Sequence, residues 1–258
     1  MTDGGRDPRS GPASLRDAIS TPEGKQRYVR RLFATIADRY DLITRLLSYG
    51  QDRRWKRTLV GLAKIQPSDR VLDLACGTGD ILFEALRYGP RRAVGLDLTL
   101  RMIELAVAAR GRSQAAIPVF LVGDMLALPF RSGDVDVVTT GYGLRNVPHL
   151  PVAIREIHRV LAPGGRLLSL DFNRPANPVM RGAYLAYLTL VGSALGLVLH
   201  RDPDTYRYIP ESIRNYPGAE AVARMLEAEG FEDVRVLPVL FGLMAIHLAR
   251  KSMPDAQC

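Results

Sequence analysis

The chain has 258 residues, of which 47% are hydrophobic and only 7% aromatic, so it is long enough to bury the core of one compact domain. Its two cysteines cannot form a disulfide framework and its four histidines show no metal-ligand spacing, so we expect a reducing compartment and no metal. The net charge of +8 is concentrated in residues 1–60, which hold 13 Lys and Arg against 7 Asp and Glu. Such an excess fits nucleic acid, an anionic membrane surface or a solvated helix face, and it does not choose between them.

The N-terminal residues are rich in Gly, Pro and charge, and they contain no apolar stretch of the kind found in a signal peptide. This composition predicts a disordered tail over 1–25. A single domain is expected over 26–258, beginning with a helical segment over 26–66.

The most informative stretch is an apolar strand at 70–74 that leads into a loop with two glycines, Gly77 and Gly79. Glycine lets a ligand approach the backbone closely, and the helix that follows offers free N–H groups, so the loop predicts a nucleotide-like cofactor. The third glycine of a dinucleotide fingerprint is absent, and so is the Gly-Lys-Ser/Thr of a phosphate loop. Asp73 and Asp80 flank the loop and favour a cationic ligand such as S-adenosylmethionine. Asp73, Gly77 and Gly79 are therefore candidate cofactor residues.

A second acidic position follows at Asp97, in the strand predicted at 92–98. It lies about 20 residues after the glycine loop, where a carboxylate accepts the ribose hydroxyls of an adenosine. The alternative is that Asp97 caps the helix predicted at 99–110, a task that Thr99 can also perform.

The strand predicted at 117–122 leads into Gly123, Asp124 and Met125. Ligands of open α/β sheets lie outside the carboxyl ends of the strands, so this turn is expected beside the cofactor. Asp124 is expected to bond the adenine amine, and Met125 to pack on the adenine ring.

The rest of the chain continues the alternation of strands and helices. The further predicted elements are a strand at 135–140, a helix at 150–161, a strand at 166–172, a helix at 218–229 and strands at 231–237 and 241–249. The pattern predicts an α/β, Rossmann-like fold with a mostly parallel seven-stranded sheet, helices on both faces and an antiparallel C-terminal hairpin. A long excursion at 173–217 is expected to form a helical lid insertion.

This excursion contains 18 successive residues without a charge, at 182–199. The length is at the lower limit for a membrane span, but a span inside an α/β domain is disfavoured, and three glycines weaken insertion. The favoured interpretation is a core helix that covers the sheet. A third interpretation, compatible with the second, is a lid helix that lines a tunnel for a greasy substrate or touches a bilayer.

Several motifs along the chain occur in a recognisable combination. They are FATIADRYDL at 33–42, WKR at 55–57, LDLACGTGD at 72–80, ALPF at 127–130, GLRNV at 143–147 and YRYIPESIR at 206–214. Together they resemble the ubiquinone/menaquinone-biosynthesis C-methyltransferases, class I enzymes that use S-adenosylmethionine to methylate a ring carbon of a polyprenylated quinol. The resemblance covers nearly the whole chain after residue 27, and it implies that 26–66 covers the substrate.

The resemblance implies cofactor contacts at Thr78, Asp97, Asp124 and Met125. Some members of the family also bind the cofactor through a serine two residues before the glycine of GLRN. That position is Gly141 here, so only its backbone is able to serve.

The resemblance further implies that Arg145, Asn146 and Tyr40 lie beside the reacting ring. Methyl transfer to carbon needs an electron-rich ring, so the quinol and not the quinone is the expected substrate. No Asp-His pair near the GLRN loop offers a dedicated base. Arg145 is expected to stabilise the quinolate oxygen, with Asn146 and Tyr40 orienting the hydroxyls. The alternative role for Arg145 is a structural salt bridge.

The identity of the ring stays open: demethylmenaquinol is favoured over 2-methoxy-6-polyprenyl-1,4-benzoquinol and demethylphylloquinol. We expect a cytoplasmic protein with peripheral contact at the inner face of the membrane, and we leave open whether it forms a homodimer. A nucleic-acid methyltransferase is disfavoured, because the chain has no Asn/Asp-Pro-Pro-Tyr/Phe run, no Pro-Cys and few aromatics for base stacking. A non-catalytic cofactor-binding protein that docks partners through 182–199 is the other alternative.

Overall fold

The computed structural model describes residues 15–48, 50–110, 117–175, 177–203 and 205–253. The strands are β1 (Arg70–Leu74), β2 (Arg92–Asp97), β3 (Val119–Val122), β4 (Val135–Gly141), β5 (Leu161–Phe172), β6 (Phe231–Val239) and β7 (Met244–Lys251). The α-helices are α1 (Leu15–Ala18), α2 (Pro22–Ile36), α3 (Tyr40–Leu47), α4 (Asp52–Ala63), α5 (Asp80–Leu86), α6 (Leu100–Ala109), α7 (Leu150–Val160), α8 (Pro178–His200), α9 (Tyr208–Asn215) and α10 (Ala219–Ala228). Short 3-10 turns are η1 (Ala37–Arg39), η2 (Leu144–Asn146) and η3 (Leu240–Gly242).

Within these residues the strands form one seven-stranded sheet in the order β3-β2-β1-β4-β5-β7-β6. Strands β1 to β5 are parallel to one another, whereas β7 is antiparallel to both β5 and β6. The predicted Rossmann-like sheet with its antiparallel C-terminal hairpin is therefore confirmed. The strand expected at 241–249 begins only at Met244, because Phe241 takes a left-handed conformation (φ 55°) inside η3.

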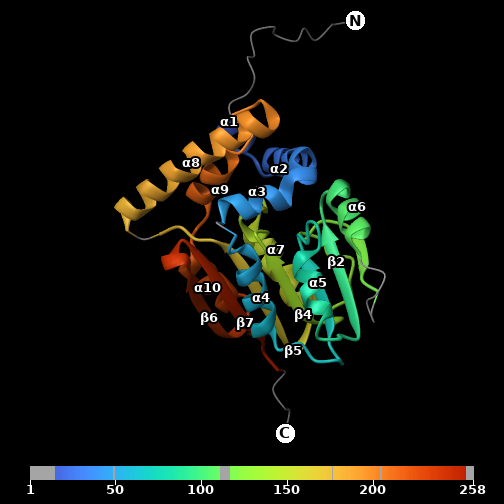
Figure 1. Cartoon of the computed structure of the whole chain (residues 1–258). Coiled ribbons are helices and arrows are strands. Elements are labelled where there is room, and N and C mark those ends of the chain that lie inside the picture. The colour runs from blue at the N-terminus through green and yellow to red at the C-terminus, as the bar shows by residue number, and fades with distance from the viewer. Residues whose placement is uncertain (1–14, 49, 111–116, 176, 204, 254–258) are drawn as a thin grey trace, which may run out of the picture.

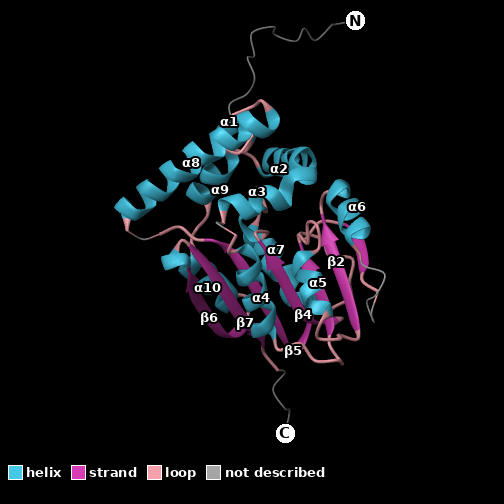
Figure 2. Ribbon diagram, viewed as in Figure 1, coloured by secondary structure: helices cyan, strands magenta, loops and turns pink. Residues whose placement is uncertain are grey.

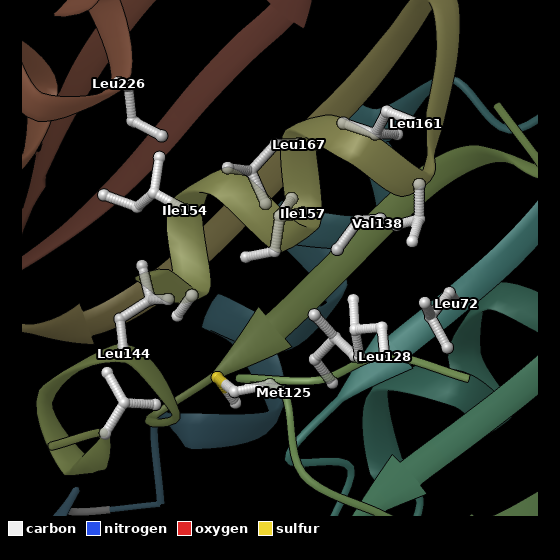
Figure 3. Close-up of a cluster of buried hydrophobic side chains, with 14 of the residues drawn as sticks. Leu72, Met125, Leu128, Val138, Leu144, Ile154, Ile157, Leu161, Leu167 and Leu226 are labelled. Carbon is white, nitrogen blue, oxygen red and sulfur yellow. The ribbon is translucent and has the colours of Figure 1, made fainter. Parts of the chain in front are cut away.

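The sheet separates two hydrophobic cores, because successive side chains of a strand point to opposite faces. In β1, Leu72 and Leu74 join the core under α7 and α10, whereas Val71 joins the core under α4 and α5. Figure 3 shows the first of these cores, with Ile154 and Ile157 of α7 at its centre.

The helices α1, α2, α3, α8 and α9 gather at one end of the sheet, above the carboxyl ends of its parallel strands (Figure 1). Figure 2 shows that this end is covered by helices and loops alone. Both helical segments that the sequence predicts, over 26–66 and 173–217, contribute to this cap.

The boundary expected for a disordered tail at residue 25 is wrong. Helix α2 begins at Pro22, since Thr21 accepts a hydrogen bond from the Gly24 N–H (3.1 Å) and proline is well suited to the first helical turn. Residues 1–14 lie outside the described residues. The described chain therefore enters the helical cap earlier than predicted.

Candidate functional site

Two cavities lie side by side beneath the helical cap. The glycine-loop cavity is lined from the glycine loop, the ends of β2, β3 and β4, and α2, by Gln26, Val29, Phe33, Tyr40, Ala75, Gly77, Leu96, Asp97, Leu98, Thr99, Met102, Gly123, Asp124, Met125, Gly141, Tyr142, Gly143, Asn146, Val147 and Pro148. The apolar cavity, about 410 Å³ in volume, is lined mainly by aliphatic and aromatic side chains of α2, α3, α8 and α9. Phe33, Tyr40 and Tyr142 line both cavities, so the two spaces share a wall.

Asp97 fixes the glycine loop from the end of β2. One carboxylate oxygen accepts a hydrogen bond from the Gly77 N–H (2.9 Å). The other accepts a hydrogen bond from the N–H of Thr99 (2.8 Å), the residue just before α6. Burial raises the pKa of Asp97, although these backbone hydrogen bonds oppose the shift. Each oxygen keeps a second lone pair, so the ribose-acceptor and helix-capping interpretations are compatible. Thr99 makes no side-chain capping bond, so Asp97 takes the place expected for it.

Asp124 and Met125 lie together at the next strand end, as the sequence predicts. Asp124 accepts the Leu126 N–H (2.9 Å) with one oxygen and the amide of Gln26, on α2, with the other. An amino group that bonds to Asp124 therefore has to share or displace Gln26. Met125 belongs both to the cavity wall and to the core beneath it, beside the carboxyl end of β4 (Figure 3).

Three predicted cofactor residues do not line either cavity. Asp73 is buried below the loop, where it accepts a hydrogen bond from the Thr139 hydroxyl (2.8 Å). Thr78 is half-buried and donates to Asp41 (2.8 Å), which ties the loop to α3. Gly79 precedes α5 with φ 91°, and a Cβ there would lie 2.8 Å from the Phe83 ring. In the structure these three residues contribute to the shape of the glycine loop through the contacts given above.

The burial of Asp73 makes a pH dependence testable. Burial raises its pKa to about 7, so the folded chain holds this proton more tightly than the unfolded chain, where the pKa is ~3.9. The stability that protonated Asp73 contributes is complete below pH ~4 and is lost as the pH rises to ~7. We expect the wild type to lose stability relative to Asp73→Asn across this window in urea unfolding; a constant difference between the two proteins would contradict this.

Gly141 lines the glycine-loop cavity, and a side chain at this position would meet Ile81. A Cβ there would lie 2.5 Å from Cδ1 of Ile81, which is buried in the core of α4 and α5. A serine at this position therefore requires the end of the Ile81 side chain to move.

We expect Gly141→Ser to lower the free energy of unfolding by about 1–3 kcal/mol, because Ile81 has to leave its packed rotamer. Ile81→Val removes Cδ1 and should relieve part of this cost. Urea unfolding of both single variants and the double variant gives the coupling between them. Strictly additive losses would show that Ile81 is not the obstacle.

Arg145 is the one charged side chain among the described residues that line the apolar cavity. It is buried beside Asp171, with 3.2 Å between Arg145 Nε and one Asp171 carboxylate oxygen. The backbone N–H of Arg145 donates a hydrogen bond to the other oxygen of Asp171 (3.0 Å). The guanidinium also donates to Asn146 (2.7 Å) and lies 4.9 Å from the centre of the Phe172 ring. The structural salt bridge that was the alternative for Arg145 is present, and Arg145 reaches the cavity as well.

The other two predicted catalytic residues occupy different places. Asn146 lines the glycine-loop cavity and donates to the Tyr142 carbonyl (2.7 Å). Tyr40, at the start of α3, lines both cavities, and burial raises the pKa of its hydroxyl. Arg145 thus lines the apolar cavity, Asn146 lines the glycine-loop cavity, and Tyr40 lines both.

Some residues of the site carry no sequence signal. Lys25 donates to the carbonyls of Arg145 (3.0 Å) and Val147 (2.7 Å) and so fastens η2 to α2. Burial and the nearby charge of Arg145 lower the pKa of Lys25 to about 8. Tyr142 lies immediately before the GLRNV motif, but neither its position nor the motif marks it as a site residue. Contacts across more than 90 residues of chain cannot be read from local spacing.

Comparison with known proteins places the chain. Residues 21–251 match the model of the ubiE/COQ5 methyltransferase family. A Dinoroseobacter shibae ubiquinone/menaquinone biosynthesis C-methyltransferase UbiE is 40% identical over 87% of this chain and 91% of its own length. A Thermus thermophilus demethylmenaquinone methyltransferase is 42% identical over 84% of this chain and 98% of its own length.

A solved structure shows the same fold at low identity. The magnesium protoporphyrin IX methyltransferase from Synechocystis PCC 6803 superposes with a TM-score of 0.59 at 20% identity, over 88% of this chain and all of that one. The predicted family, the C-methyltransferase activity in quinone biosynthesis and the S-adenosylmethionine cofactor are confirmed by the family match. The chain belongs to the ubiE/COQ5 methyltransferase family.

Proposed function

We propose that the acceptor is a polyprenylated quinol, with demethylmenaquinol favoured, and that the apolar cavity holds its ring and the first part of its tail. The observation that carries this proposal is the wall of Phe33, Tyr40 and Tyr142 that the apolar cavity shares with the glycine-loop cavity. The demethylmenaquinone methyltransferases among the relatives support this choice of ring. The helical segments over 26–66 and 173–217 act as substrate cover and lid.

The glycine-loop cavity fits S-adenosylmethionine by its chemistry. Asp97 offers acceptors to ribose hydroxyls, Asp124 offers an acceptor to an amine, and Met125 offers an apolar surface to a ring. When bound, S-adenosylmethionine supplies an electrophilic methyl group on a positively charged sulfur. The bare backbone at Gly141 and Gly143 leaves room for a close approach at the end of β4.

The residues around the shared wall then promote attack by the ring carbon. Arg145 stabilises negative charge on the quinol oxygen, which makes the neighbouring carbon more nucleophilic. Asn146 and Tyr40 hold the ring against the cofactor in the orientation that the transfer needs. After transfer, the ring carbon loses its proton and aromaticity returns, so one proton is released in each turnover.

The direct test is an assay with purified protein, labelled S-adenosylmethionine and each reduced quinone, with products identified by mass. We expect methylated product from demethylmenaquinol, and less or none from 2-methoxy-6-polyprenyl-1,4-benzoquinol and demethylphylloquinol. DNA and RNA serve as further acceptors that should stay unmodified. Absence of product with all three quinols would overturn the proposal and favour a protein that only binds the cofactor.

We further propose that α8 docks on the inner face of the cytoplasmic membrane. The core helix favoured from the sequence is wrong: only 22% of the apolar window of α8 is buried, although the helix is long and apolar enough to span a membrane. Its exposed residues recur at helical spacing and form an apolar stripe, which comprises Val179, Ala183, Ala186, Leu190, Ala194 and Leu197. Phe241, at the apolar cavity, is 92% exposed. A bilayer covers such a surface and delivers a lipid substrate to the cavity beside it.

The α8 stripe can be tested with vesicles of phosphatidylglycerol and phosphatidylcholine. We expect Leu190→Glu combined with Leu197→Glu to reduce the membrane-bound fraction roughly tenfold, because both positions of the stripe lose favourable burial in lipid. Val107→Glu, at a residue of α6 that is 47% exposed, is the matched control and should leave binding unchanged. Equal binding of all three proteins would refute docking through α8.

A homodimer stays a separate prediction, which gel filtration tests.

A further inference from the structure

The hydroxyl of Tyr142 belongs to a buried chain of charged groups. It donates to Asp52 with 2.6 Å between the oxygens, and Asp52 lies 2.7 Å from Lys56 Nζ. Lys56 in turn lies 2.9 Å from Asp80, at the start of α5. The family resemblance marked Lys56 only as part of a motif and gave Tyr142 and Asp52 no role. These contacts connect the end of β4 to the first turns of α4 and α5.

The protonation of this chain is set by its charges. Burial alone would lower the pKa of Lys56, but the carboxylates of Asp52 and Asp80 raise it above its ordinary value, so Lys56 stays positive. Asp52 and Lys56 thus form a buried ion pair, and Asp52 is the group that accepts the Tyr142 hydroxyl. Burial, and then the charge of Asp52, raise the pKa of Tyr142 well above its ordinary value, so its hydroxyl keeps its proton. That proton is committed to Asp52, and the Tyr142 oxygen has only lone pairs left to offer.

Tyr142 lines the apolar cavity, and its hydroxyl bonds to Asp52, which stands in the chain between two residues of that cavity's wall. Ser48 and Trp55, which precede and follow Asp52 in the chain, both line that cavity. The Asp52 N–H donates to the Ser48 hydroxyl (3.2 Å), so the acceptor of Tyr142 is held against the same wall. The backbone on either side of Tyr142, at Gly141 and Gly143, lines the glycine-loop cavity instead. Tyr142 thus lies between the glycine-loop cavity and the apolar cavity.

We infer that Tyr142 makes the apolar cavity selective for the reduced form of its substrate. A hydroxyl whose proton is committed elsewhere can only accept, and the quinol has an O–H to donate whereas the quinone has only carbonyl oxygens. A quinone oxygen placed there would face a lone pair of Tyr142 with no hydrogen between them, and a buried acceptor that lacks a donor is costly. The inference rests on the proposed quinol acceptor and adds the residue that distinguishes its two oxidation states.

The test measures binding under anaerobic conditions, with protein saturated with S-adenosylhomocysteine so that no methyl transfer occurs. The probes are a short-tailed demethylnaphthoquinol and the corresponding quinone. We expect the wild type to bind the quinol roughly tenfold more tightly than the quinone, and Tyr142→Phe to reduce this ratio to about one. Asp52→Ala releases the Tyr142 proton for donation into the cavity, so this variant should gain affinity for the quinone.

Tyr206→Phe is the matched control, since it removes a hydroxyl from another tyrosine of the same cavity, one that pairs with His200 (2.8 Å). It should keep the wild-type ratio. If Asp52→Ala does not fold, the ratio measured for Tyr142→Phe tests the inference alone, because this variant keeps the aromatic ring and its packing. A wild-type ratio in Tyr142→Phe would overturn the inference while leaving the proposed function intact. Failure of the wild type to bind either probe would instead contradict the proposed acceptor.

Discussion

Replacing Arg145 with Ala is expected to lower kcat by about 10²–10³-fold while the affinity for S-adenosylmethionine stays nearly unchanged. The guanidinium is the charged group at the apolar cavity that is able to stabilise a quinolate oxygen, and the buried surroundings strengthen its effect. It does not line the glycine-loop cavity, so cofactor binding has no direct dependence on it. Steady-state kinetics with reduced quinone and calorimetric titration of the cofactor measure the two quantities separately.

The pairing with Asp171 requires a control for stability. Removing Arg145 alone leaves a buried carboxylate without its partner, which typically costs about 3–5 kcal/mol. Arg145→Met combined with Asp171→Asn removes both charges and should recover most of the stability in urea unfolding. Recovery of wild-type kcat in this double variant would show that Arg145 is only structural, and an equal loss of cofactor affinity would also count against its catalytic role.

The second large effect is expected at Asp97. In Asp97→Ala the N–H groups of Gly77 and Thr99 lose their partner and the ribose loses its acceptor, so the dissociation constant for S-adenosylmethionine should rise at least about 100-fold. Asp97→Asn keeps one acceptor and should fall between this variant and the wild type. Calorimetric titration gives both values.

Asp80→Asn provides the comparison for Asp97. Asp80 also flanks the glycine loop but lines neither cavity, so its substitution should change cofactor affinity by no more than about twofold. A large loss at Asp80 with none at Asp97 would reverse the assignment that the structure supports.

The fold, and the meeting of several candidate cofactor residues at one cavity, could be predicted from the sequence because the relevant signals are local. Strand periodicity and the two glycines of the loop place Gly77, Asp97 and Asp124 at successive strand ends, and a parallel sheet brings such ends together. Proximity along the chain misled at Asp73, which adjoins the loop but points into the core between β1 and β4. Spacing alone did not say which of the nearby side chains faces the ligand.

The prediction for α8 failed for a different reason. The segment 182–199 of α8 contains no charged residue and therefore no charged face, so its pattern does not reveal which side is buried. The contacts Lys25–Arg145 and Tyr142–Asp52 were equally beyond prediction, because each joins segments that only the folded chain brings together. The Thr21-Pro22 start of α2, by contrast, is a recognisable capping signal that the composition of the tail concealed.

Helix α2 contributes residues to both cavities, so the binding of the cofactor and the binding of the quinol both depend on it. Its Gln26 reaches Asp124 in the cofactor space, its Phe33 faces both cavities, and its Lys25 holds the backbone of Arg145. We expect two ligands that contact the same helix to influence each other's binding. The factor by which the cofactor changes the affinity for the quinol must then equal the factor by which the quinol changes the affinity for the cofactor. Cofactor titrations with and without quinol, in the wild type and in variants of α2, therefore report on the same linkage from both sides.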